Sequence, residues 1–116
     1  MQQLKALLKD LATQELAGLS DAETLERTAA LVAAGNMVAA ELARTARHGQ
    51  LTQAPERDGL KSMRSWLIGH ERVSANEASK VLRAGRLLEH FPLVAAGFAA
   101  GEITAAQVEV LSLIHI

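Results

Sequence analysis

Residues 74–90 read SANEASKVLRAGRLLEH, and this stretch indicates the class of the fold. Ser74 and Glu77 match the capping box, in which each side chain accepts a hydrogen bond from a free amide at the start of a helix. Apolar or small residues then recur with a helical period at Ala78, Val81, Leu82, Gly85 and Leu88. Pro92 follows closely, and the residue before a proline disfavours helical conformation. The pattern therefore predicts a helix over residues 75–90.

The same helix-start pattern occurs at Ser20 with Glu23 and at Thr104 with Gln107. We expect helices over residues 3–17, 20–49, 60–69, 75–90 and 93–100, and from residue 104 onward. Residues 49–59, GQLTQAPERDG, contain Gly, Pro and polar residues without a period and are predicted to form a connecting loop. Gly101 suits the left-handed exit of a helix. No segment alternates with period two, so the predicted fold is all-α: a multi-helix domain with one long Ala-rich helix and a helix-turn-helix-like segment.

The long helix carries a coiled-coil-like seam, because its apolar or small residues alternate spacings of four and three. These positions are Leu25, Ala29, Val32, Asn36, Ala39, Ala43 and Ala46. Asn36 has two alternative interpretations: it sets the register of a helix pair, or it is a polar edge of the seam. The seam predicts that the helix pairs with another helix.

Composition limits the class of protein. The chain has 116 residues, of which 49% are hydrophobic and 22% charged, as expected for one ordinary domain. Aromatic residues make up only 3%, so the core must consist largely of Ala, Leu and Val. The absence of cysteine excludes disulfides, thiolate metal sites and thiol nucleophiles. We find neither a signal-peptide pattern nor an apolar run of about 18 residues, so we expect a cytoplasmic protein without a membrane partner.

Positive charge is concentrated in residues 57–86, which contain seven Lys/Arg against three Asp/Glu, a local net charge of +4. This block coincides with the helix-turn-helix-like segment, the layout of many DNA readers. The candidate nucleic-acid contacts are Arg64, Arg72, Lys80, Arg83 and Arg86. Such a polar arc is also typical of a solvated helix face, and both interpretations stay open. Leu87 lies inside the arc, which predicts that another helix or domain covers it.

Catalytic and metal-binding patterns are missing from the sequence. The histidines, His48, His70, His90 and His115, have no metal-ligand spacing. No Gly-rich phosphate loop occurs, so we expect no catalytic residue, metal or cofactor. Trp66, the single tryptophan, is predicted to anchor the core beneath the turn because Met63 and Leu67 lie beside it in helical register.

Residues 58–111, DGLKSMRSWLIGHERVSANEASKVLRAGRLLEHFPLVAAGFAAGEITAAQVEVL, resemble the domain-of-unknown-function family 222, also called the 13E12 repeat family, which is abundant in actinobacteria. The resemblance combines a Trp-Leu pair, a Ser-x-x-Glu-Ala helix start, a segment running into Pro, and a Gly-x-Ile-Thr step. The matching positions are Gly59, Ser62, Trp66, Leu67, Ser74, Glu77, Ala78, Ala84, Leu87, Leu88, Pro92, Gly101, Ile103, Thr104 and Gln107.

The resemblance implies a functional context. Members of the family commonly carry an HNH nuclease domain downstream, and nothing in this chain matches that motif. The chain is thus expected to be the non-catalytic N-terminal module of an HNH endonuclease-like protein, assisting DNA positioning or regulation. The alternative is a protein-interaction or oligomerisation module with no nucleic-acid role. The candidate partners are DNA, a downstream HNH domain and a second copy joined through helices.

The last six residues, LSLIHI, abandon the preceding mixture of charged and apolar residues. The hexapeptide matches the translation of a transposon end used as a sequencing adapter. We therefore predict a truncated helical domain over residues 1–110 and an adapter-derived tail over residues 111–116. A native apolar helix end is the alternative.

Overall fold

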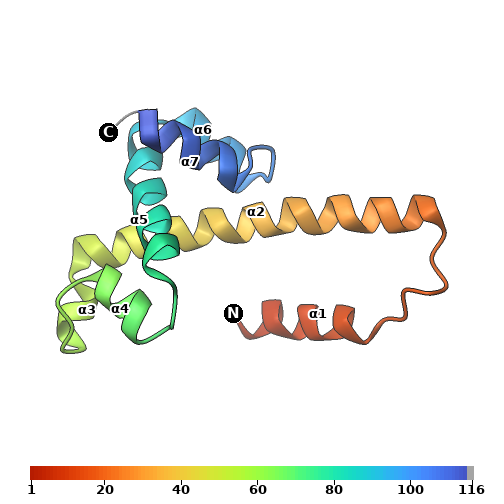
Figure 1. Cartoon of the computed structure of the whole chain (residues 1–116), viewed down its shortest axis with the longest axis horizontal. Helices are drawn as coiled ribbons and strands as arrows, with labels where there is room; N and C mark the ends of the chain where they lie inside the picture. Colours follow the sequence, from red (N-terminus) through yellow and green to blue (C-terminus); the bar gives the residue numbers. More distant parts are fainter. Residues whose placement is uncertain (115–116) are drawn as a thin grey trace. The chain divides into compact units, whose positions relative to one another are not determined.

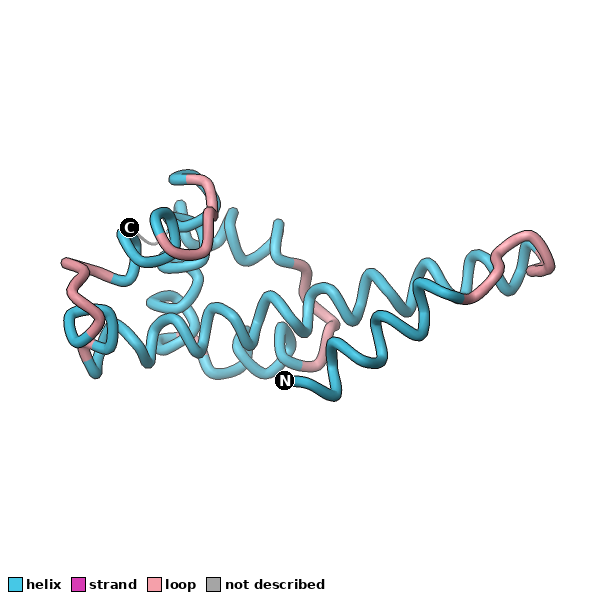
Figure 2. The backbone as a smooth tube through the Cα atoms, turned by 90° about the horizontal axis from the view of Figure 1, so that it is seen from below, coloured by secondary structure: helices cyan, strands magenta, loops and turns pink. Residues whose placement is uncertain are grey.

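The computed structural model describes residues 1–114, and all the regular elements in that range are α-helices (Figures 1 and 2). The helices are α1 (Gln2–Thr13), α2 (Asp21–Thr52), α3 (Ala54–Arg57), α4 (Met63–Gly69), α5 (Ala75–His90), α6 (Pro92–Ala99) and α7 (Ala105–Ile114). The predicted all-α class and the single long helix are confirmed. Within residues 1–114, we find no helix with the combined length and apolarity that a bilayer span requires.

The three predicted capping patterns all begin helices. The Ser20 amide donates to Glu23 Oε1 at 3.0 Å, and the Glu23 amide donates back to Ser20 Oγ at 3.1 Å. Thr104 and Gln107 exchange the same two bonds at 2.9 and 3.1 Å. Ser74 Oγ accepts from the Glu77 amide at 3.1 Å. Because these bonds satisfy amides that have no partner inside the helix, they determine where α2, α5 and α7 begin.

Several predicted boundaries were wrong. Helix α1 ends at Thr13 rather than at residue 17, because Gln14 adopts an extended backbone with ψ 137°. The expected loop at residues 49–59 contains the end of α2 and all of α3. Gly49 is a buried helical residue against which the Met63 side chain packs, so this glycine provides space and does not end the helix. Helix α4 begins at Met63 rather than at residue 60, because Ser62 Oγ caps it by accepting from the Ser65 amide.

The chain forms two compact units, Met1–Leu31 and Val32–Ile116. The first unit contains α1 and the beginning of α2. Arg27 joins these two segments: one guanidinium nitrogen donates to Gln14 Oε1 at 2.7 Å and another to the Leu11 carbonyl at 3.1 Å. No residue of α1 is buried.

The second unit contains the core, which consists of two clusters. In the first, Ala40 of α2 packs with Leu87, Phe98 and Val108 from the three helices α5, α6 and α7. In the second, Ala46 of α2 packs with Leu67, Ala78 and Leu82 from α4 and α5. Figure 1 shows α5 crossing the C-terminal part of α2, with α6 and α7 together at one end of α5 and α4 at the other. Helix α5 therefore contributes to both clusters.

The predicted seam on α2 is correct only toward the C-terminus of the helix. Ala43 and Ala46 are buried, and Ala39 packs partly against the first cluster. Leu25 and Val32 are exposed, at 71% and 57%, and Ala29 is exposed as well. Residues of α2 are buried only where other helices pack against them. The periodicity of the sequence does not predict how far along α2 this packing extends.

Small residues allow close approach between helices. A Cβ atom at Gly85 of α5 would lie 2.8 Å from the Ala43 carbonyl oxygen of α2, which is shorter than a van der Waals contact. Gly101 has φ 77° and lies beside the Ala33 backbone, so the predicted left-handed exit is confirmed. Asn36 connects α2 to α7: its Oδ1 accepts from the Ala105 amide at 2.8 Å, and its Nδ2 donates to the Val32 carbonyl at 3.0 Å. Asn36 is thus a cap for α7.

Candidate nucleic-acid interface

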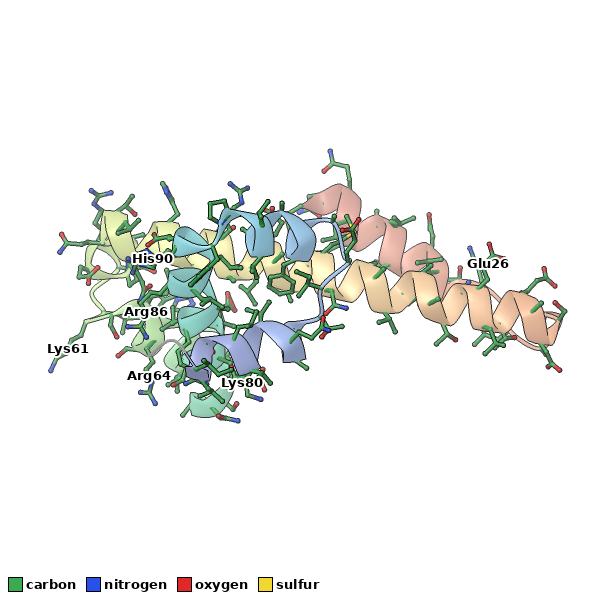
Figure 3. All side chains as sticks on the ribbon, turned by 90° about the horizontal axis from the view of Figure 1, so that it is seen from above. Glu26, Lys61, Arg64, Lys80, Arg86 and His90 are labelled. Carbon is green, nitrogen blue, oxygen red and sulfur yellow. The ribbon has the colours of Figure 1, made fainter. Side chains whose placement is uncertain are left out.

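The candidate interface lies on α4, on α5 and on the chain immediately before α4. Figure 3 shows Lys61, Arg64 and Arg86 at this end of the second unit, with Lys61 and Arg64 extending away from the helices. Each of the three side chains is exposed. Lys61 directly precedes Ser62, the N-cap of α4, and Arg64 lies in the first turn of that helix. We call these three residues the cationic strip.

A hydrogen bond connects the two helices of the strip. Arg64 Nε donates to Ser79 Oγ of α5 at 3.3 Å. Ser79 and Arg86 are seven residues apart, so they share one face of α5 and are separated by about 10.5 Å along the helix axis. The helices therefore hold Arg64 and Arg86 on the same surface although the two residues are distant in sequence.

Arg83 is less available than the sequence suggested. Its Nη2 donates to Glu109 Oε1 of α7 at 2.7 Å, and the two side chains are 25% and 23% exposed. Its Nε is buried without a hydrogen-bond partner in the part of the chain that the structure describes. Arg83 thus joins α5 to α7 and does not belong to the cationic strip.

The other two predicted contacts differ from one another. Lys80 Nζ lies 3.5 Å from Glu77 Oε1 one turn away, a mostly exposed pair of small energetic value. Arg72 is exposed in the turn between α4 and α5 and has a positive φ of 59°. Within residues 1–114 the structure gives Arg72 no ion pair. The helix-turn-helix-like segment therefore retains free cations, but on fewer side chains than the sequence predicted.

The prediction for Leu87 is confirmed. Leu87 is only 6% exposed and packs in the first core cluster with Phe98 and Val108. Helices α6 and α7 thus cover Leu87, although its neighbours on that face of α5 are polar. That cover leaves only part of the predicted polar arc in contact with solvent.

Trp66 is not the buried anchor that we expected. The buried residue of α4 is its neighbour Leu67, which is 4% exposed. Trp66 is half-buried at the edge of the second cluster, and its indole stacks on the His70 ring with centroids 5.2 Å apart. Its Nε1 donates to Asp58 Oδ2 at 3.4 Å. Because the indole needs this polar partner, it occupies the boundary between the core and water.

Other residues of the family-like pattern stabilise the backbone or pack in the core. Gly59 has φ 82°, a conformation that favours glycine, and Pro92 occupies the first position of α6. Ala78 is fully buried, and Leu88 is partly buried against the first cluster. These positions support the helices that carry the cationic strip.

A groove of about 590 Å³ lies between α2, α5 and α6. An ion pair borders it, since Arg47 Nε lies 2.7 Å from Glu89 Oε1. The hydrogen bond from Arg47 lowers the pKa of Glu89 below its usual value, and the same bond raises the pKa of Arg47. Among the described residues, no group of three His, Asp or Glu side chains could hold a metal ion. His115 lies outside the described residues.

No protein-family model, no curated protein and no solved structure matches the chain.

Two features of this surface were missed in the sequence. Lys61 belongs to the basic block of residues 57–86 but was not predicted as a contact. Glu109 was not recognised as the partner of Arg83, because the two residues are 26 positions apart. The excess of Lys and Arg over Asp and Glu in residues 57–86 was the signal that could have identified Lys61.

Proposed function

We propose that this chain is a non-catalytic helical module that contacts duplex DNA through phosphates and serves an HNH endonuclease-like protein. The cationic strip carries the proposal, because Lys61, Arg64 and Arg86 are exposed at one end of the second unit and none of them has a carboxylate partner within residues 1–114. Lys and Arg side chains of this kind provide the salt-dependent part of DNA affinity. The resemblance to the 13E12 repeat family supports the link to an HNH nuclease.

The charge distribution favours this surface over those that carry Arg83, Arg47 and Arg44. These three cations pair with the carboxylates of Glu109, Glu89 and Glu41. Their charge is therefore compensated within the fold. The basic block of residues 57–86 keeps uncompensated charge on α4, on the turn and on the exposed face of α5, as a phosphate-binding surface requires.

Fluorescence anisotropy with a labelled duplex tests the proposal. We expect the chain to bind the duplex at about 50 mM salt and to bind it much more weakly at about 200 mM. The reason is that salt cations compete with the protein for the phosphates. The variant Lys61→Gln/Arg64→Gln/Arg86→Gln should bind much more weakly. The variant Lys5→Gln/Lys9→Gln/Arg44→Gln has the same net charge and serves as the matched control. No binding of the unmodified chain at low salt, or equal loss in both variants, would overturn the proposal.

A second function has its own supporting observation. Val38 and Leu42 of α2 are 47% and 44% exposed, and they lie four residues apart on the same face of the helix. An exposed apolar helix face is typical of protein–protein contact. Light scattering of the unmodified chain and of Val38→Lys/Leu42→Lys tests this alternative: an oligomer that the double variant dissociates would support it, and a monomer in both would exclude self-association.

A further inference from the structure

We infer that the first half of α5 enters the major groove of the duplex and that Asn76 selects adenine there, an inference that rests on the proposed function. A helix-turn-helix reader places the start of its second helix against base edges, while its first helix lies across the backbone. Here α4 takes the place of the first helix and α5 that of the second. The exposed face of this helix pair carries one free amide together with several cations.

Helices α4 and α5 form a fixed pair. Leu67 of α4 packs with Ala78 and Leu82 of α5 in the second core cluster. Outside that cluster, Arg64 Nε donates to Ser79 Oγ at 3.3 Å. The packing and the hydrogen bond therefore hold Arg64 beside the first half of α5.

The open part of this face is limited to the first two turns of α5. From Arg83 onward α7 covers it, because Arg83 bonds to Glu109 at 2.7 Å and Leu87 is only 6% exposed. Lys80 and Asn76 lie on the same face, about one and two turns before Arg83. Asn76 is exposed, and the Lys80 side chain is 40% exposed. The free surface is thus near the start of α5, the part that a recognition helix uses.

Asn76 has the chemistry that reads adenine. Among the described residues its side chain has no hydrogen-bond partner, so its carbonyl oxygen and its amino group are both available. In the major groove adenine offers its N7 as an acceptor and its N6 amino group as a donor, and one Asn side chain can bond to both. A bidentate contact of this kind favours the right base pair over a wrong one by roughly 5- to 150-fold.

Three cations belong to the same part of the fold as Asn76. Arg72 is exposed in the turn before α5, and Lys80 lies one turn after Asn76. Arg64 is held beside α5 by its hydrogen bond. Lys80 Nζ lies 3.5 Å from Glu77 Oε1, but the two side chains are 40% and 61% exposed, so a phosphate can replace this carboxylate. Contacts of these cations to phosphates fix the helix pair on the duplex and bring the Asn76 amide to the base edges.

Selection from a library of duplexes tests the inference. The full chain is mixed at about 50 mM salt with duplexes whose central ten or so base pairs, about one helical turn, are randomised, and the bound fraction is sequenced. We expect adenine to be enriched at one position by roughly fivefold or more. Asn76→Ala should abolish this enrichment. Asn76→Asp should abolish it too, because the carboxylate keeps the shape of the amide but cannot donate to adenine N7.

Two matched variants change the charge beside Asn76 and leave its amide in place. Arg64→Gln should weaken the binding of all sequences and keep adenine at the enriched position, as expected for a phosphate contact. Glu77→Gln removes a neighbouring carboxylate, so it should strengthen the binding of all sequences and also keep adenine. Far-UV circular dichroism shows whether each variant is folded.

The possible failures are distinguishable. Binding without an enriched position, enrichment of another base, or enrichment of adenine that survives in the folded Asn76 variants would overturn this inference and leave the proposed function intact. Absence of binding to any duplex at about 50 mM salt would overturn the proposed function together with this inference.

Discussion

Three arginines of one basic segment have different environments. Arg83 is bonded to Glu109 and partly buried, Arg64 donates to a neutral hydroxyl, and Arg86 is exposed. The same side chain therefore joins helices at one position and remains available to a ligand at another. The distinction depends on whether a carboxylate from a distant part of the chain lies within reach.

The aromatic residues Phe98 and Trp66 also differ in burial, and substituting each of them tests this difference. Phe98 is 1% exposed in the first core cluster, so Phe98→Ala should lower the free energy of unfolding by about 3–5 kcal/mol. Trp66 is partly exposed, so Trp66→Ala should cost less, about 1.5–3 kcal/mol. Urea unfolding followed by circular dichroism gives both values. Equal costs for the two variants would show that the indole is as buried as the phenyl ring.

At the scale of elements, the helices are determined locally and their packing is not. The hydroxyl and carboxylate groups that cap α2, α5 and α7 lie within four residues of the amides that they satisfy. The sequence therefore predicts these helix starts well. The predicted ends were poorer, because Gly49 was interpreted as a helix stop although it is a point of close packing against Met63.

Glycine substitutions test the packing between α2 and α5. In Gly85→Ala the new methyl group would meet the Ala43 carbonyl oxygen at 2.8 Å, so we expect destabilisation by about 1–3 kcal/mol. Gly35 is also inside a helix and has no atom within 4 Å of the same position. Gly35→Ala should therefore stabilise the chain by about 0.5–1 kcal/mol through helix propensity. Thermal unfolding of the two variants decides the matter, and stabilisation by both would contradict the close approach.

At the scale of the whole chain, buried residues are confined to the second unit. Both core clusters lie in Val32–Ile116, and no residue of α1 is buried. Local stability depends on how many apolar contacts an opening event must break. The two units should therefore differ in the free energy of local unfolding.

Hydrogen exchange measured by mass spectrometry tests this difference. Amides of α1 should exchange early, through local opening of small free-energy cost, whereas amides of α5 should exchange last because both core clusters depend on that helix. Peptides covering Gln2–Thr13 and Ala75–His90 provide the comparison. Equal protection of the two helices would contradict this prediction, because it would require α1 to be held by contacts that its exposed side chains do not make.

The sequence by itself determined the all-α class, the long helix, the three capped starts and the concentration of cations in residues 57–86. Each of these depends on residues within a few positions of one another, so periodicity and capping chemistry are sufficient to predict it. Only the tertiary structure decided which cations remain free and which residues form the core. Arg83 with Glu109, Arg47 with Glu89, and Asn36 with Ala105 are separated by 26, 42 and 69 positions. Such pairs form only where the helices cross, and the crossing depends on how small residues such as Gly85 and Ala43 allow two backbones to approach.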